Sequence, residues 1–137
     1  MSLFVDTSAW YAAADSGDRS NPRATEVLAS GERLITSDQV LVETWLLLRH
    51  RLHRGAAERF WEGLRAGVAS IECVVEADLE AAWLIGQEFA DQDFSVVDRT
   101  SFAVMQRLGV TRVASFDDDF AIFRFGPDRR RSFEVVR

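Results

Sequence analysis

The sequence predicts one α/β domain over residues 1–137, with a central, mostly parallel sheet flanked by helices. Short apolar runs alternate with segments of helical spacing, as in folds built from parallel crossovers. The length of 137 residues suits one domain, and 47% hydrophobic with 28% charged residues is ordinary for a globular protein. No repeat or low-complexity linker divides the chain. These observations predict the fold class and leave the strand order open.

The chain begins with a predicted strand that ends at an acid. Residues 3–5 form an apolar run followed at once by carboxyl and hydroxyl groups, which predicts a buried strand with Asp6 at its carboxyl end. Helical spacing resumes immediately. Ser20 or Asn21 can cap a second helix, with Pro22 in its first turn. Parallel sheets bind ligands beyond the carboxyl ends of their strands, so Asp6 is the first candidate site residue.

A second short strand leads into the longest predicted helix. Thr36 or Ser37 caps this helix, and Gln39 is placed to close a capping box. Gly55 then separates it from a further helix over residues 56–64. The first half of the chain therefore supplies two strands and four helices.

The second half alternates strands and helices. Its predicted elements, in order, are a strand at 71–75, a helix at 76–91, a helix from Ser95 to Gly109, a strand at 110–116, a helical turn opening at 117–120 and an edge strand at 133–136. In the first of these helices, Leu79, Trp83 and Phe89 are expected to face the core. Cys73 is expected to be a buried structural thiol, and the four tryptophans are expected to be mostly core.

The charge of the chain excludes several functions. The net charge is −6, and all sixteen basic residues are arginines. Without lysine the chain cannot form a P-loop, and it lacks the lysine that receiver-type signalling domains place beside their acids. An acidic chain is also a poor non-specific nucleic-acid binder, so any such binding would depend on local arginines and bound cations.

Three further absences concern location. No apolar run approaches the roughly 20 residues of a membrane helix. No secretory leader is visible, and the single cysteine permits no internal disulfide. We therefore expect a cytoplasmic protein with no membrane association.

Two aspartates directly follow predicted strands, Asp6 after the first and Asp117 after the fourth. Their carboxylates meet if those strands are neighbours; otherwise each is only the cap of the helix that follows. Asp98 occupies the capping-box position after Ser95, which by itself explains its presence. Asp119, two residues beyond Asp117, can reach the same place.

Glu43 lies on a helix face whose neighbours three and four residues away are apolar. A buried carboxylate there needs a partner, and one alternative is an ion pair with Arg99 or Arg107. The other is a site shared with the aspartates. Two carboxylates about 4 Å apart repel by about 4 kcal/mol at an effective dielectric of about 20, so converging acids require a cation. Sites made only of oxygen ligands select Mg²⁺ or Mn²⁺.

In the order and spacing of these residues, the chain resembles a PIN domain, specifically the VapC-type toxin ribonucleases of toxin–antitoxin systems. The similarity covers nearly the whole chain. The segments that carry it are residues 5–8 (VDTS), Glu43 in the third helix, residues 93–98 (DFSVVD) with the helix that follows, and residues 115–120 (SFDDDF). Ser115 stands where the family often has threonine, which is a small departure.

The resemblance implies a catalytic quartet of Asp6, Glu43, Asp98 and Asp117. Asp6 and Asp98 would hold the metal directly, and Asp117, with Glu43, would bind a second ion or order its water, so that the expected metal-binding residues are Asp6, Asp98 and Asp117. Ser8 matches the family's hydroxyl near the first acid, and Asp119 is expected to support the ligands. The resemblance further implies a Mg²⁺-dependent endoribonuclease, with Mn²⁺ as an alternative ion. It also implies a homodimer and a small VapB-type antitoxin that covers the site.

Two alternatives stay open: a catalytically silent PIN-like binding partner, and another metal-dependent phosphodiesterase. The candidate RNA contacts, which could equally be a solvated helix end and a mobile tail, are Arg49, Arg51, Arg54 and residues 129–131. The candidate aromatic residues for a dimer or antitoxin surface are Trp45, Phe60 and Trp61. The sequence does not reveal the RNA target, the antitoxin or the number of metal ions.

Overall fold

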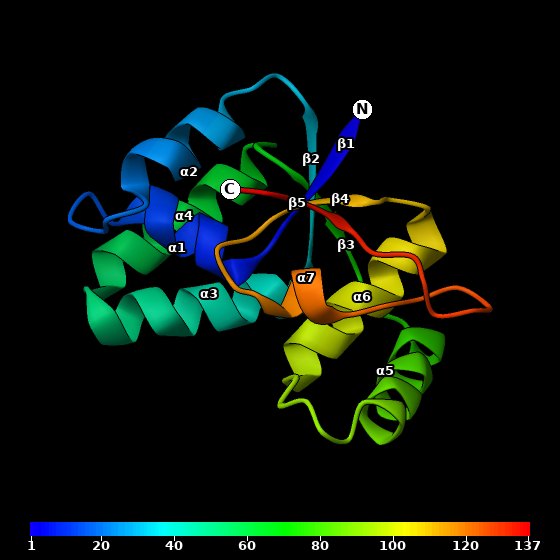
Figure 1. The fold of residues 1–137 in the computed structure, drawn as a ribbon. Helices are drawn as coiled ribbons and strands as arrows, with labels where there is room; N and C mark the ends of the chain where they lie inside the picture. The colour runs from blue at the N-terminus through cyan, green and yellow to red at the C-terminus, as the bar shows by residue number, and fades with distance from the viewer.

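A five-stranded, entirely parallel sheet in the order β3-β2-β1-β4-β5 forms the centre of the computed structural model, which describes residues 1–137 (Figure 1). The strands are β1 (Ser2–Val5), β2 (Arg33–Ser37), β3 (Ser70–Glu72), β4 (Arg112–Ala114) and β5 (Glu134–Val136). From β1 the chain adds β2 and β3 on one side, then returns to add β4 and β5 on the other. The strand order therefore reverses between β1 and β4, where parallel sheets bind their ligands.

Seven helices flank the sheet. They are α1 (Thr7–Ala14), α2 (Asn21–Leu28), α3 (Asp38–Arg51), α4 (Arg54–Arg65), α5 (Glu76–Glu88), α6 (Val96–Leu108) and α7 (Asp119–Ile122). One group consists of α1 to α4, in which α1 contacts α2 and α3, and α3 contacts α4 (Figure 1). The other consists of α5, α6 and α7, and α3 touches α6 between the two groups. The α/β class with helices around a parallel sheet is the fold predicted from the sequence.

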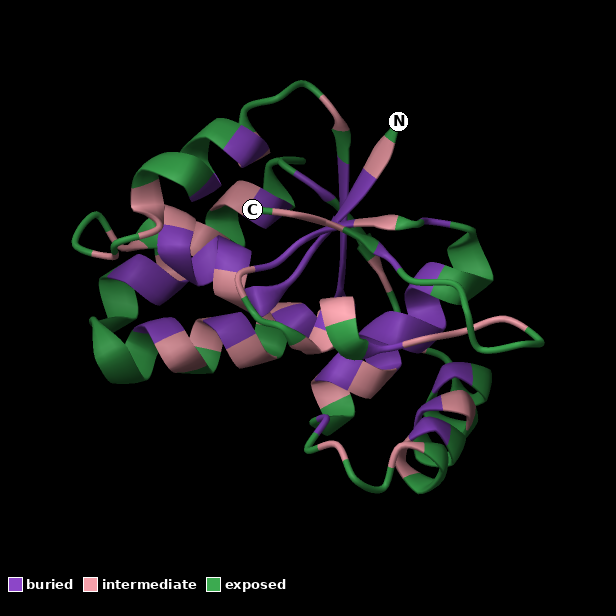
Figure 2. Cartoon of the chain, in the orientation of Figure 1, coloured by how far each residue is buried: buried purple, intermediate pink, exposed green.

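The core is built on the central strand. Leu3, Phe4 and Val5 of β1 have no exposed surface, and the buried colour in Figure 2 follows the inner strands. A strand covered by helices on both faces has to be apolar throughout, which explains this uninterrupted run. Beside it, the rings of Phe102 and Phe123 stack with their centroids 4.3 Å apart, which fixes α6 against the segment after α7.

The start of α3 differs from its prediction in one detail. Ser37 is the cap, and its hydroxyl accepts the backbone N–H of Val40 at 3.1 Å. Gln39 is consequently the second helical residue and cannot close a capping box. Asp38 instead uses its carboxylate to accept the N–H of Val74, which ties the start of α3 to the segment after β3.

The break between α3 and α4 also lies earlier than predicted. Helix α3 ends at Arg51, with Leu52 as its C-cap, and His53 caps α4, with its Nδ1 accepting the Ala56 N–H at 3.1 Å. Gly55 therefore lies inside the first turn of α4. A histidine cap carries no strong sequence signal, whereas glycine does, and this explains why the boundary was misplaced.

The inward face of α5 was predicted wrongly for Leu79 and Trp83, whereas Phe89 at its C-terminal end packs against the core as predicted. Leu79 is 49% exposed and Trp83 is 61% exposed, whereas Asp78, Ala82 and Ile85 are buried. Leu79 and Trp83 suggested the core face because they are large and apolar. The face that packs inward instead carries Ala82, Ile85 and the carboxylate of Asp78. Trp61 is also 43% exposed, so the expectation that the tryptophans are mostly core is wrong for two of the four.

Three strands are shorter than predicted, the last of them, β5, by one residue, and the early end of β3 changes the position of the cysteine. The third strand ends at Glu72, so Cys73 lies beyond it and is exposed rather than buried. The strand that precedes Asp117 spans only Arg112–Ala114. None of the seven helices combines the length and the hydropathy that a membrane crossing requires.

Candidate active site

Asp6 lies at the end of the central strand and is almost sealed from solvent, with 2% of its surface exposed. Its backbone N–H donates to the carbonyl of Ala114 at the end of β4, at 3.1 Å. Its carboxylate accepts the Ser8 N–H at 3.5 Å and so also caps α1. The capping alternative is therefore correct as local geometry, but it accounts for only part of what surrounds Asp6.

Two serine hydroxyls hold one oxygen of this carboxylate. Asp6 Oδ2 accepts from Ser8 Oγ at 2.9 Å and from Ser115 Oγ at 3.0 Å. The same hydroxyl oxygens accept the backbone N–H groups of Phe116 at 2.9 Å and Asp117 at 3.1 Å. This network joins the ends of β1 and β4. Because every bond goes to Oδ2, the lone pairs of Oδ1 are left for another ligand.

Asp98 is the third residue of α6 and forms a complete capping box with Ser95. Asp98 Oδ2 accepts the Ser95 N–H at 3.2 Å, and Ser95 Oγ accepts the Asp98 N–H at 3.1 Å. These bonds begin the helix and fix the carboxylate at its N-terminus. At the other end of α6, Gly109 follows the last helical residue, as the sequence predicted, and it adopts the left-handed conformation with φ 69°.

The aspartates of the site have raised pKa values. Burial raises the pKa of Asp98, and the carboxylates of Asp119 and Asp6 raise it further, to about 8. Burial also raises the pKa of Asp6 to about 6, although the two serine hydroxyls act in the opposite direction. The pKa of Asp117 is raised by burial and by its acidic neighbours. These carboxylates therefore lie close enough to oppose each other's ionisation.

Three carboxylates form a compact group. Asp98, Asp117 and Asp119 each offer one oxygen, and the three oxygens lie within 4.8 Å of one another. None of these acids, and not Asp6 either, forms an ion pair with an arginine. A set of anionic oxygen ligands without a protein counter-charge fits a hard divalent cation such as Mg²⁺ or Mn²⁺. Asp119, expected only in support, lies within this group.

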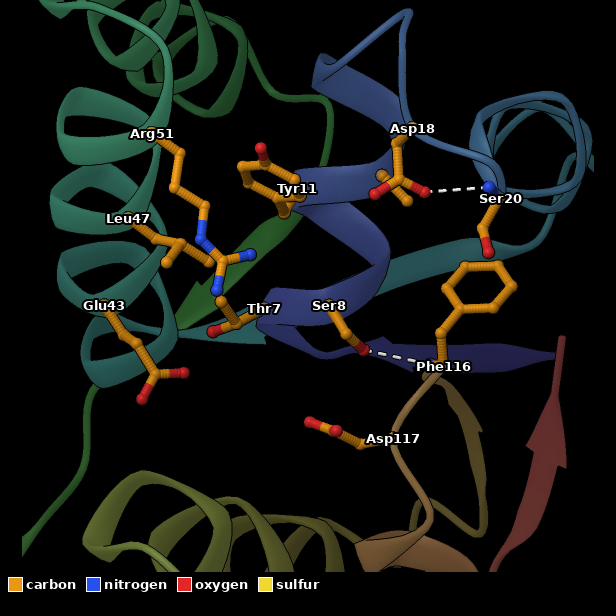
Figure 3. A pocket seen from close by; sticks show the side chains of 11 residues that line it. Thr7, Ser8, Tyr11, Asp18, Ser20, Glu43, Leu47, Arg51, Phe116 and Asp117 are labelled. Carbon is orange, nitrogen blue, oxygen red and sulfur yellow. Dashed lines mark hydrogen bonds between the residues drawn. The ribbon is translucent and has the colours of Figure 1, made fainter.

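Glu43 lies outside that group and enters the site from α3. It shares a pocket with Thr7, Ser8 and Asp117, and Figure 3 shows its carboxylate beside this opening. It is half-buried and forms no hydrogen bond or ion pair within the chain. A carboxylate in this position is free to bind a second cation or a water molecule at the edge of the acidic group.

The arginine partners considered for Glu43 are engaged elsewhere. Arg99 donates to the carbonyls of Phe94 and Ala82. Arg107 forms an ion pair with Asp78. The alternative that Glu43 is simply half of a buried arginine pair is therefore wrong.

The sequence-predicted residues thus come from four separate segments. The structure brings Asp6, Asp98 and Asp117 together, with Glu43 at the margin of the same pocket. Ser115 was noted only as the place where the family often has threonine and was not predicted as a site residue, although it binds Asp6 about as closely as Ser8 does. Its signal in the sequence is a hydroxyl near the end of a predicted strand and two residues before Asp117. Around Asp6 the order is reversed, because Ser8 follows the aspartate by two residues.

The candidate RNA-contact arginines lie in different surroundings. Arg51 lines the pocket with Glu43, whereas Arg54 pairs with Glu58 on the exposed face of α4. The run at 129–131 is no free tail, because Arg129 pairs with Glu88 and the backbone of Arg131 bridges to that of Phe125. Among the candidate arginines, Arg51 is therefore the one that shares a pocket with Glu43 and Asp117.

Comparisons with known proteins agree with this geometry. The PIN domain family model matches residues 3–126. The chain is 38% identical over 127 residues to the 23S rRNA-specific endonuclease VapC20 from two strains of Mycobacterium tuberculosis, covering 90% of this chain and 95% of the relative. The crystal structure of Mycobacterium tuberculosis VapC20, described as a sarcin-ricin loop cleaving toxin, superposes with a TM-score of 0.82. That superposition has 36% sequence identity and covers 87% of this chain and 92% of the crystallised chain.

Proposed function

The chain belongs to the PIN-domain family as a VapC-type endoribonuclease toxin, and on that premise we propose that it hydrolyses a ribosomal RNA loop with Mg²⁺ held by its clustered aspartates. The observation that carries the proposal is the convergence of carboxylates from β1, α6 and the segment after β4 without a neutralising arginine. The RNA class is proposed from the relatives, which are described as acting on 23S rRNA and its sarcin-ricin loop.

Asp6, Asp98 and Asp117 would hold the cation. Asp6 presents Oδ1 because its other oxygen is saturated by serine hydroxyls, and Asp98 is held in place by the Ser95 N–H. When bound, a divalent cation lowers the pKa of an attacking water and neutralises charge on the scissile phosphate. Mn²⁺ would serve in the same oxygen site, whereas a metal that prefers sulfur or nitrogen ligands would not.

Glu43 would accept a proton or order the attacking water from its position at the margin of the pocket. The water oxygen bonds to phosphorus while the bond from phosphorus to the 3′ oxygen breaks, and the leaving oxygen is protonated. The products are a 5′-phosphate and a 3′-hydroxyl, because the RNA 2′-hydroxyl takes no part. No histidine lies among the pocket residues to act as a general base in its place.

A cleavage assay tests this proposal directly. A fluorescent RNA hairpin with the sarcin-ricin loop sequence should be cut with Mg²⁺ or Mn²⁺ and left intact with EDTA. Mapping the ends should find 5′-phosphates, and 2′,3′-cyclic phosphate ends would contradict the mechanism. Asp6→Asn should abolish the cutting without unfolding the chain. If the unaltered protein binds this RNA but never cuts it, the silent binding partner is the correct interpretation.

We also propose that the chain forms a homodimer and is covered by a VapB-type antitoxin, the partner that membership of this toxin family implies. Large apolar side chains that could take part in such contacts are exposed on α3 and α5, namely Val42, Leu46, Leu79 and Trp83. Sedimentation velocity on the isolated chain tests the dimer. A single species at the monomer mass of 15.5 kDa at all concentrations would overturn it.

A further inference from the structure

A pocket of about 440 Å³ extends away from the acidic centre between α1 and α3 (Figure 3). Ser8, Glu43 and Asp117 line the end beside the aspartates, and Tyr11 and Arg51 line another part. The volume lies within the range of small-ligand sites. The pocket therefore continues from the place proposed for the scissile phosphate into space that the catalytic acids do not use.

Arg51 is the one cationic residue that lines this pocket. It lies two helical turns from Glu43, which places their backbones about 12 Å apart along α3. Its guanidinium carbon stands 5.3 Å from the centre of the Tyr11 ring, and it forms no ion pair. Tyr11 is itself fixed, since its hydroxyl donates to Asp15 at 2.9 Å. The guanidinium thus rests against an anchored tyrosine, close to its hydroxyl, and no carboxylate neutralises it.

Phe116 supplies an aromatic wall to the same pocket. Its backbone N–H donates to Ser8 Oγ at 2.9 Å, so its position is tied to the network around Asp6. Its ring is only partly buried and faces the pocket in Figure 3. Partly exposed aromatic rings are the surfaces on which single-stranded bases stack, and arginine is the residue that best binds phosphate in a planar, two-pronged manner.

We propose that this pocket binds the nucleotide adjoining the scissile phosphate, with Arg51 contacting its phosphate and Phe116 stacking on its base. The proposal rests on the RNA-cleaving function proposed above and assigns it a specificity site. Three carboxylates, those of Asp18, Glu43 and Asp117, line the pocket and would repel RNA. A single stacked and unpaired arginine among them gives the neighbouring phosphate one defined place.

The test measures binding rather than cleavage. Fluorescence anisotropy would follow a labelled sarcin-ricin loop hairpin with Mg²⁺ present, in the Asp6→Asn background so that the RNA stays intact. Arg51→Gln should raise Kd roughly tenfold, and Phe116→Leu should do the same by removing the stacking surface. Arg51→Gln should also reduce the slope of log affinity against log salt by about 0.7, the value for one phosphate contact on a single strand.

Arg33→Gln is the matched control, because Arg33 is an exposed arginine at the first position of β2. It therefore lies at the amino ends of the strands, whereas the acids lie beyond their carboxyl ends. This variant removes the same charge and should leave the Kd within twofold, by the near-neutral effect expected of a distant surface change. Arg51→Lys should recover only part of the affinity, because an ammonium group cannot make the planar contact.

The outcomes separate this proposal from the one on which it rests. If the Kd of Arg51→Gln equals that of Arg33→Gln, the nucleotide pocket is wrong even where the unaltered protein cuts RNA. If the unaltered protein cuts no RNA but its RNA binding depends on Arg51 and Phe116, the nucleotide pocket is supported and the RNA-cleaving function is contradicted. In the unaltered background, Arg51→Gln should raise KM more than it lowers kcat.

Discussion

Two aspartates with the same local role have opposite chemistry in this molecule. Asp78 in α5 and Asp98 in α6 are each the third residue of a helix, and each accepts the backbone N–H of the cap residue, at 3.0 Å and 3.2 Å. Both are buried. In the sequence each lies three residues after the residue that caps its helix, although only Ser95, and not Val75, has a side chain that can cap.

Their tertiary neighbours make the difference. Arg107 donates two hydrogen bonds of 2.9 Å to Asp78, and these bonds lower its pKa. Asp98 has no arginine partner, and its pKa is raised by burial and by Asp119 and Asp6. A capped carboxylate with an arginine stabilises the fold, whereas one without an arginine creates a demand for a cation. The difference between the two aspartates is therefore the missing counter-charge rather than the acid itself, and this is what distinguishes the candidate active site.

The largest expected effect comes from exchanging each acid for its amide. Asp98→Asn should lower RNA cleavage by about 100-fold or more, because a ligand of the cation is weakened and such ions supply several kcal/mol of transition-state stabilisation. The fold should persist, since the amide oxygen can still accept the Ser95 N–H. Asp78→Asn should leave cleavage unchanged below its unfolding temperature. Equal losses of RNA-hairpin cleavage in Asp98→Asn and Asp78→Asn would show that the two aspartates do not differ in function.

Removing Arg107 should leave Asp78 in the same state as Asp98, as a buried carboxylate without a positive partner. Arg107→Gln leaves Asp78 buried without its counter-charge, and we expect the free energy of unfolding to fall by about 3 kcal/mol. Urea denaturation followed by circular dichroism measures this loss. Adding Asp78→Asn to Arg107→Gln should recover part of it, because no unpaired charge is then buried. A double variant less stable than Arg107→Gln would contradict the assigned pairing.

The two regions should also respond to pH in opposite directions. Asp98 and Asp6 have raised pKa values, so their contribution to stability is complete below 3.8 and is lost as the pH rises through about 6 and about 8. Asp78 has a lowered pKa, so its contribution is present above 3.8 and is lost in acid. Urea titrations in EDTA should therefore show that the free energy of unfolding falls with rising pH, and that it falls less in Asp98→Asn. Mg²⁺ should restore stability at pH 8, and a loss unaffected by Mg²⁺ would count against the site.

The smallest effect is expected where the two helices touch. A Cβ at Gly86 of α5 would overlap Arg99 Nη1, which donates to the Ala82 carbonyl from the residue next to Asp98. Gly86→Ala should change stability by less than about 1 kcal/mol, because the improved helix propensity offsets a weak hydrogen bond.

Cleavage by the same variant should fall by less than about tenfold, as expected for a residue that supports a metal ligand indirectly. Gly63→Ala in α4 is the control, since its Cβ would make only an ordinary 3.7 Å contact with Val68. It should keep full cleavage. If both variants cleave normally, Arg99 has no part in holding Asp98.

Local signals carried much of the fold. The apolar run at 3–5, the cap at Ser95 and the terminal Gly109 predicted their elements correctly, because each depends on a few adjacent residues. The inward face of α5 could not be read in this way. Its exposed Leu79 and Trp83 look like core residues, and its buried Asp78 looks like a surface residue until Arg107 is placed against it.

The sequence alone determined which acids were available and where the strands would present them, since strand ends and helix caps are local properties. Only the tertiary structure decided that β1 and β4 are neighbours, that Ser115 reaches Asp6, and that Asp119 joins the carboxylate group. It also decided that Arg107 neutralises Asp78 and that Asp98 has no arginine partner. The physical reason is that electrostatic interactions depend on distance in space, and residues far apart in the chain become neighbours only when the sheet assembles.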